Sequence, residues 1–317
     1  NQLWTRTVGK LPSNLDTKKV TLKVTDYNVD ADENIYLSTL AYNSSAFNTR
    51  YQVELCKVSP SGKVSLIPVE IGGRVPRKIW LEEGINKQLK CIIAYSENSK
   101  EYLINGLLVG DISEGEITNI SSKECKPSFY DFVNKVGNQF YSVATYTCNL
   151  EKVIKEKDGT LIYLFEFQHT DIEHALINLK DNLLMKVDPN GAIDWINALP
   201  KNHQKSFKIA ESKYKYFRGE NNHYVLFMDA LKSSKSYDLS VYAKKYKTNT
   251  PGVLAYYKIN HNSGRITKHQ ILETDISKEK KLSRLYMNKI SQIEDSKLVL
   301  EAYLNKKTEV LIEIDFQ

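Results

Sequence analysis

Charged side chains and tyrosines alternate in several short strand-like segments, and these are the residues whose types could do chemistry. Carboxylate, ammonium and guanidinium groups beside phenol rings suit recognition of a polar small molecule, a glycan or a peptide. The alternative is that these groups neutralise one another in pairs, which needs no ligand. The binding candidates are Asp26, Lys78, Tyr130, Asp131, Lys215, Arg218 and Arg284, interleaved with Tyr214, Tyr216 and Tyr286.

Paired carboxylates would allow a different chemistry, the hydrolysis of glycosidic bonds by an acid and a base or nucleophile. Asp26 and Asp131, with Glu166 or Asp229 in the same repeats, form the candidate set. The sequence does not set their separation, so this alternative rests on fold-level analogy. No metal-binding, phosphate-binding or activated-nucleophile motif occurs, so we expect no metal, no cofactor and a non-catalytic protein.

A recurring phrase indicates how these residues are positioned. It consists of an apolar strand end, a polar turn with glycine, and a second β-branched strand. Proline presets the first turn position, asparagine or serine can bond the local backbone, and glycine accepts a positive φ. The phrase is therefore typical of a β-hairpin. Its copies are Leu55–Val64, Val109–Ile117, Leu184–Ile193 and Tyr257–Ile266.

Two further strand-like runs precede each turn, so each repeat contains four antiparallel strands, as a propeller blade requires. The sequence predicts an all-β propeller of five such blades in a single domain, 1–317. The innermost strand of each blade is then the first, which brings the binding candidates to the axial channel. The expected blades are approximately 18–72, 73–127, 128–204, 205–280, and 281–317 together with 1–12.

The last blade lacks its fourth strand, because the chain ends after the apolar run 309–316. The N-terminal segment Trp4–Lys10 has the same Trp-to-Lys spacing as Trp195–Lys201, which follows the third turn. We expect the N-terminal segment to pair with the C-terminal strand and close the propeller, removing an exposed edge. A frayed N-terminal extension is the alternative.

Inserted segments between the second and third strands are expected to carry loops on one face, where binding residues often lie. The charged segment 149–159 predicts a short helix or a flexible loop. The segment 171–182 has helix-like spacing of its apolar residues. In the fourth repeat, 231–250 is rich in lysine and serine.

Composition and charge bear on the partners and the location of the protein. The net charge of +6 over 317 residues is spread out, without the basic block of a nucleic-acid-binding protein. No apolar run approaches the roughly 20 residues of a membrane span. The start at Asn1, without methionine, favours a removed signal peptide and therefore export. We expect the protein to be a monomer. In an exported protein the four cysteines can either form disulfides or remain buried thiols. They are Cys56, Cys91, Cys125 and Cys148.

One long stretch, Leu183–Trp195 followed by Pro200–Gln204, resembles a phrase in uncharacterised exported β-propeller-like proteins of Bacteroidetes-type bacteria. There, "K-hydrophobic-D-x-x-G" leads to a tryptophan and then "P-K-x-Q". The run Tyr224–Asp229 resembles their next strand, although Met228 replaces the asparagine of their Asn-Asp pair. The resemblance covers about residues 128–272. It implies a cell-envelope location and a propeller-like fold, and it implies no activity. From the repeats and the inserted loops we expect a glycan, a peptide or an envelope protein as partner.

Overall fold

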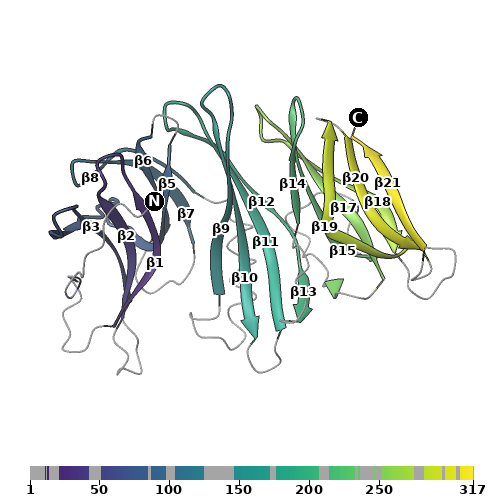
Figure 1. Cartoon of the computed structure of the whole chain (residues 1–317), viewed down its shortest axis with the longest axis horizontal. Helices are drawn as coiled ribbons and strands as arrows, with labels where there is room; N and C mark the ends of the chain where they lie inside the picture. Colours follow the sequence, from purple (N-terminus) through teal and green to yellow (C-terminus); the bar gives the residue numbers. More distant parts are fainter. Residues whose placement is uncertain are drawn as a thin grey trace. The chain divides into compact units, whose positions relative to one another are not determined.

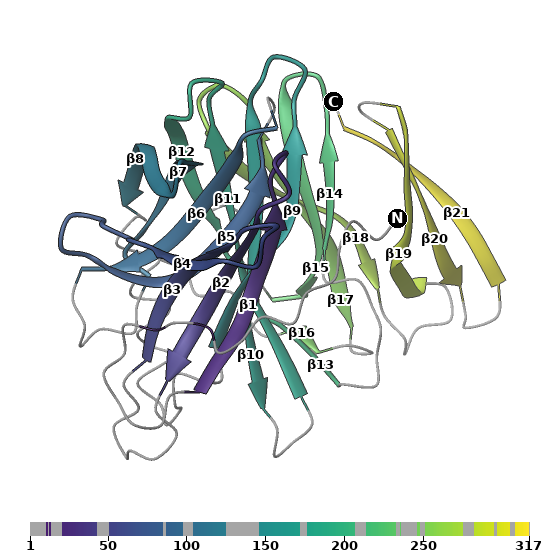
Figure 2. The ribbon, with the colours of Figure 1, turned by 60° about the vertical axis from the view of Figure 1, so that its left-hand side comes forward.

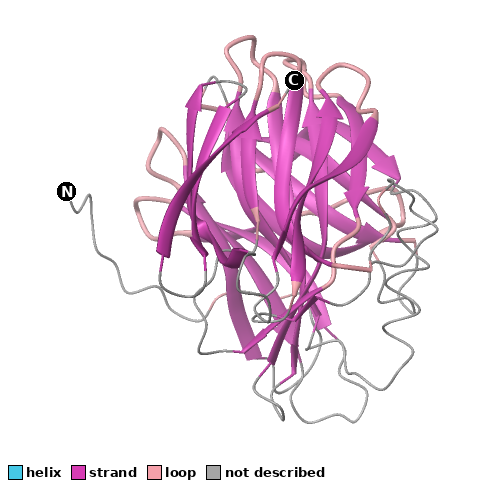
Figure 3. Cartoon of the chain, turned by 90° about the vertical axis from the view of Figure 1, so that its right-hand side faces the viewer, coloured by secondary structure: helices cyan, strands magenta, loops and turns pink. Residues whose placement is uncertain are grey.

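All regular elements in the described part of the computed structural model are strands, drawn in magenta in Figure 3. This confirms the all-β class. No helix in that part is long and apolar enough to cross a membrane. The described residues are 11, 13, 21–42, 51–84, 87–97, 104–124, 146–171, 176–206, 214–232, 235, 246–247, 251–274, 282–294, 297–304 and 308–316.

The first two sheets are antiparallel meanders in which every strand pairs with its neighbour in the chain (Figure 1). Buried positions concentrate on the central strands of the second sheet, whose sequences LKCIIAYS and GLLVGDIS are apolar on both faces. The edge strand EITNISSKE is polar and mostly exposed. The strands are β1 (Thr21–Val29), β2 (Ile35–Tyr42), β3 (Tyr51–Val58) and β4 (Val64–Ile67), then β5 (Val75–Glu83), β6 (Leu89–Ser96), β7 (Gly106–Ser113) and β8 (Glu116–Glu124).

The third sheet follows the chain from β9 to β11, and β12 pairs with β11. Two short strands extend it, because β13 pairs with β11 and β16 pairs in parallel with β13. Its strands are β9 (Tyr146–Lys155), β10 (Leu161–Asp171), β11 (Leu176–Val187), β12 (Ile193–Leu199), β13 (His203–Ser206) and β16 (Tyr246–Lys247).

The last sheet contains two groups of strands joined by a single parallel pair, Thr274 with Leu282. The four strands of the first group pair in order, and the three strands of the second group form an antiparallel meander. They are β14 (Lys215–Arg218), β15 (Asn222–Ala230), β17 (Gly252–Asn260) and β18 (Ile266–Thr274), then β19 (Leu282–Glu294), β20 (Lys297–Leu304) and β21 (Thr308–Asp315).

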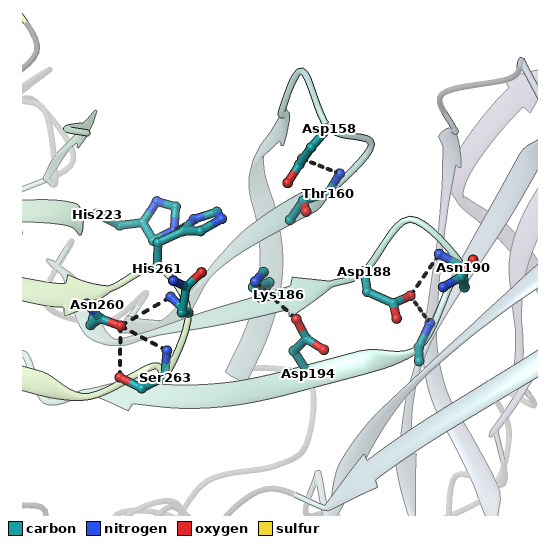
Figure 4. A network of polar contacts seen from close by, with 12 residues as sticks. Asp158, Thr160, Lys186, Asp188, Asn190, Asp194, His223, Asn260, His261 and Ser263 are labelled. Atoms are coloured by element: carbon teal, nitrogen blue, oxygen red, sulfur yellow. Dashed lines mark hydrogen bonds and ion pairs between the residues drawn. The ribbon is translucent and has the colours of Figure 1, made fainter. Parts of the chain in front are cut away.

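The predicted glycine turns are confirmed as the links between third and fourth strands. In each, the glycine has a positive φ between 66° and 91°, the region that side chains with a Cβ avoid. Polar side chains at the turn entrance bond the turn backbone: Asp188 Oδ1 accepts from the amides of Asn190 and Ala192 at 2.8 Å each (Figure 4). Asn260 Oδ1 accepts from the Ser263 amide at 2.9 Å. Each hairpin is thus specified within its own few residues.

The predicted fold class, an all-β propeller of five blades, is confirmed. Four successive groups have four strands paired in chain order, and β19–β21 form a fifth group of three. The expected fourth strand of that group, Trp4–Lys10, lies outside the described residues, so closure through the two termini stays a prediction. The blade boundaries and the single domain 1–317 also stay predictions.

Two predictions for the third repeat are wrong. Residues 149–155 belong to strand β9 rather than a helix or loop. Residue 171 ends strand β10 and 176–182 belong to strand β11, while 172–175 lie outside the described residues. Asp158–Gly159 forms the β9–β10 turn, where Gly159 has φ 95° and Asp158 accepts a hydrogen bond from the Thr160 amide. The charged residues Glu151, Lys152 and Lys155 are therefore exposed residues of a strand. The expected first strand of this blade, around Tyr130 and Asp131, lies outside the described residues.

The chain divides into two compact units. Unit 1 is Asn1–Asn134, Val153–Ile162 and Met185–Ile196, and unit 2 is the remainder. In unit 1, apolar residues of the first two sheets share one core that includes Leu55, Ile79 and Ile93, all fully buried. In unit 2, β15 and β17 contribute to a second core with β19–β21. Burial of facing sheets against one another, rather than helical covering, stabilises each unit.

Three cysteines are buried free thiols: Cys56, Cys91 and Cys148. Burial raises the pKa of the Cys91 thiol to about 12 and also raises the pKa of Cys56. These thiols act as small apolar residues. Cys125 lies outside the described residues.

Candidate functional site

Side chains of the first strand of the first sheet bind the backbone of the first strand of the second sheet. Asp26 Oδ2 accepts a hydrogen bond from the Leu81 amide at 2.9 Å, and Asn28 Nδ2 donates to the Leu81 carbonyl at 3.1 Å. Among the strands that the structure describes, β5 is at the edge of its sheet, so these side chains satisfy backbone groups on its unpaired side. Figure 2 shows β1 and β5 side by side. Two first strands of unit 1 therefore adjoin.

A second carboxylate, Glu82, lies next to this contact. Burial raises its pKa above the ordinary value, the nearby Asp26 carboxylate raises it further, and the Lys155 ammonium lowers it. Lys155 is the last residue of β9, the first strand of the third sheet, and lies in unit 1. We call Asp26, Asn28, Glu82 and Lys155 the first-strand cluster. All four come from the first strands of successive sheets, and Asp26 is the member that the sequence predicted as a binding residue.

Asp26 is held in one orientation. Its Oδ1 accepts from the Tyr27 amide and its Oδ2 from the Leu81 amide, both at 2.9 Å. Glu82 is half-buried, and its raised pKa lets it keep a proton at a higher pH than an ordinary glutamate. A protonated carboxyl donates one hydrogen bond and accepts others. The cluster can therefore offer both donors and acceptors to a polar ligand.

The raised pKa of Glu82 predicts a pH-dependent effect on folding. The Glu82 carboxyl holds its proton more tightly in the folded chain than in the unfolded chain. The stability that this protonation contributes is therefore complete below the ordinary pKa of 4.5 and is lost as the pH rises through the raised pKa. Glu82→Gln should stabilise the chain at pH 7 by about 0.5 kcal/mol after solvent screening, and by nothing at pH 3.5. Urea unfolding at both pH values measures this. The matched control is Glu83→Gln, at the exposed end of β5; an equal gain there would contradict the prediction.

The other predicted binding residues lie in different surroundings. Lys78, on β5, places its ammonium 5.2 Å from the ring centre of buried Trp80. Alternation along the strand puts Lys78 and Glu82 on the same face. In unit 2, Lys215 is half-buried on β14, and Arg218 donates to the carbonyls of Gly219 and Glu220. Arg218 thus forms hydrogen bonds with the backbone of the turn that follows it.

Three predicted residues cannot be placed with their side chains. Tyr130 and Asp131 lie outside the described residues, and of Arg284 only the backbone, in β19, is described. Among the described candidates, Asp26 and Lys78 belong to unit 1, whereas Lys215 and Arg218 belong to unit 2.

The carboxylates considered for glycoside hydrolysis in unit 2 are paired with lysines. Glu166 is fully buried and bonded to the Lys201 ammonium, which also lies 5.3 Å from the Tyr214 ring centre. Asp229 Oδ2 lies 2.7 Å from Lys268 Nζ, and both side chains are buried. In each pair, the attraction between the two charges compensates for the hydration that both groups lost on burial. These carboxylates are therefore held in buried ion pairs within unit 2.

Sequence reasoning missed Glu82 and Lys155. Glu82 was overlooked because the predicted strand ended at Leu81, although Lys78, Trp80 and Glu82 continue the alternation. Lys155 was placed in a helix or loop. The Asp-Gly pair at 158–159, a hairpin signal, would have shown that a strand ends just before it.

No protein-family model and no curated protein matches the chain. Solved structures similar to it include a levansucrase variant from B. megaterium, at 10% identity over 93% of this chain and 83% of that chain, with a TM-score of 0.34. A protein of unknown function from Dyadobacter fermentans is 10% identical over 91% and 74%, with a TM-score of 0.36. An endo-arabinase from Bacteroides thetaiotaomicron is 10% identical over 92% of both chains, with a TM-score of 0.30. All three TM-scores lie below 0.5.

Proposed function

We propose that the chain is a non-catalytic binding module of the bacterial cell envelope, exported, which binds a glycan at the first-strand cluster. The main observation in support is that Asp26, Glu82 and Lys155 lie close enough to interact in unit 1. Burial and the Asp26 carboxylate raise the pKa of Glu82. Sugar hydroxyls both donate and accept hydrogen bonds. A carboxylate, a carboxyl that can keep its proton and an ammonium group match that chemistry.

A glycan fits this site better than an extended peptide. Peptides commonly add a strand to an open sheet edge through main-chain hydrogen bonds. At β5 the Leu81 amide and carbonyl are already bonded to Asp26 and Asn28. That stretch of the edge of β5 is therefore closed to strand addition, so a ligand there would be recognised by side-chain groups.

A glycoside hydrolase is the second candidate, and one observation favours it. A carboxyl with a raised pKa next to a second carboxyl group is the arrangement that acid catalysis of glycoside cleavage uses. Against this, both oxygens of Asp26 already accept backbone hydrogen bonds, which hold it away from the role of a free nucleophile, although each oxygen can still accept a hydrogen bond from a sugar hydroxyl. The described alternatives Glu166 and Asp229 are paired with lysines. These pairings support binding over turnover.

A glycan array probed with the full chain, followed by calorimetric titration of the best oligosaccharide, tests the proposal. We expect Glu82→Gln to weaken binding at least tenfold, while Glu83→Gln binds like the parent chain. Equal affinity of the two variants would place the ligand elsewhere and overturn the site. A chromogenic glycoside panel runs in parallel, and turnover that Glu82→Gln abolishes would replace the binding function by hydrolysis. Fractionation of the source cells tests the envelope location.

A further inference from the structure

Two histidines and a tyrosine form a linear contact in unit 2. His223 is the second residue of β15 and is fully buried, His261 follows β17 and is half-buried, and Tyr216 is on β14. Tyr216 Oη lies 2.6 Å from His223 Nδ1, and His223 Nε2 lies 2.9 Å from His261 Nδ1. Figure 4 shows the two imidazoles adjacent. The first-strand cluster, in unit 1, plays no part in this arrangement.

The backbone fixes both imidazoles. Residue 223 pairs with residue 259 across β15 and β17, and the His261 amide donates to the Asn221 carbonyl at 3.0 Å. The two nitrogens are therefore brought together by strand register and by the turn, and not by chance contact of flexible side chains. Such rigid elements are the usual supports of a functional site.

Neutral His223 has two tautomers, and they imply different roles. With the proton on Nε2, His223 donates to His261 Nδ1 and accepts from the Tyr216 hydroxyl at Nδ1. With the proton on Nδ1, it donates to the Tyr216 oxygen, and its Nε2 lone pair then faces His261 Nδ1. The second tautomer is that of a metal-ligating histidine, whose other ring nitrogen normally donates to an oxygen that orients it. No proton leaves His223 when one tautomer replaces the other.

We propose that His223 Nε2 and His261 Nδ1 bind a divalent transition metal of the copper(II) or nickel(II) type. Metal–imidazole bonds are about 2.0–2.1 Å long. Two nitrogens 2.9 Å apart then subtend an angle of about 90° at the metal, with bonds of that length. Right angles between neighbouring ligands are typical of tetragonal copper(II) and nickel(II) sites. A tetrahedral zinc ion would need a separation of about 3.3 Å, so it fits less well.

Tyr216 is a positioning residue for this site, because it contacts His223 and not the metal. Its oxygen holds the Nδ1 proton and so presents Nε2 to the ion. Loss of such an orienting partner typically costs 10–100-fold in metal affinity. The half-buried His261 leaves a route for the ion from solvent.

Titration of the full chain with nickel(II), followed by calorimetry, tests the proposal, and copper(II) electron paramagnetic resonance identifies the ligands. We expect one ion per chain and hyperfine coupling to two imidazole nitrogens. His261→Gln should weaken binding at least tenfold, and Tyr216→Phe should weaken it about tenfold. The matched control is His269→Gln, which removes an exposed imidazole of β18 and should bind like the parent chain.

The possible results separate clearly. Unchanged affinity in His261→Gln, a spectrum without imidazole nitrogens, or no binding by the parent chain would each overturn the metal site and leave the histidine contact as a hydrogen bond. Far-ultraviolet circular dichroism confirms that each variant is folded. His261 is chosen over buried His223 because a half-buried side chain is less needed for folding.

Discussion

Lys201→Met is expected to lower the free energy of unfolding by about 3–5 kcal/mol. Lys201 is 1% exposed and Glu166 is not exposed at all, so the variant removes the ammonium that is bonded to a carboxylate shielded from water. The cost is the penalty of an uncompensated buried charge rather than the net value of the pair. Guanidinium unfolding followed by circular dichroism measures it.

The double variant Glu166→Gln with Lys201→Met is the matched control. Because a buried ion pair replaced by neutral groups of similar volume is often neutral in stability, the double variant should recover most of the loss. If the single variant unfolds with the midpoint of the parent chain, or the double variant is no better than the single one, the pair does not have this role.

Phe227→Ala is the second large expected effect, a loss of about 3–5 kcal/mol. The ring is 1% exposed and stacks on Tyr257, with ring centres 5.0 Å apart and planes inclined by 15°. The Lys268 ammonium lies 5.8 Å from its centre. Truncation removes apolar burial, leaves a cavity and takes one aromatic partner from the lysine.

Phe227→Leu separates these contributions. It keeps most of the apolar volume and removes the aromatic face, so we expect a loss of about 1–1.5 kcal/mol. Denaturant midpoints and slopes of the three chains provide the measurement. A leucine variant as unstable as the alanine variant would show that ring stacking, rather than cavity formation, dominates at this position.

The repeats were predictable because their determinants are local. Gly62, Gly115, Gly191 and Gly264 each close a hairpin through neighbouring residues, and the confirmed blades follow from them. The third repeat was misread because the exposed charges Glu151, Lys152 and Lys155 concealed the strand β9. At Leu176 and Leu179 a helical spacing competed with strand pairing, and pairing within β11 prevailed.

The candidate site was only partly predictable. Asp26 was chosen from its place on a first strand, and it does contact the next first strand. Glu82 becomes notable only through its partners, Asp26 and Lys155, which are distant in the sequence. The same holds for Lys201 with Glu166 and for His223 with His261, since register across several strands determines which residues meet.

The self-contained bonding of the glycine turns has a consequence for the order in which the chain acquires structure. At Asp188 and Asn260 the turn amides are bonded by a side chain at most four residues away. Short loops of this kind lose little entropy on closure, and hairpins form in about 1–10 μs. Such turns can nucleate in parallel along the chain. The slow step is then the joining of separately nucleated hairpins into sheets, so overall folding speed depends on long-range pairing and not on the turns.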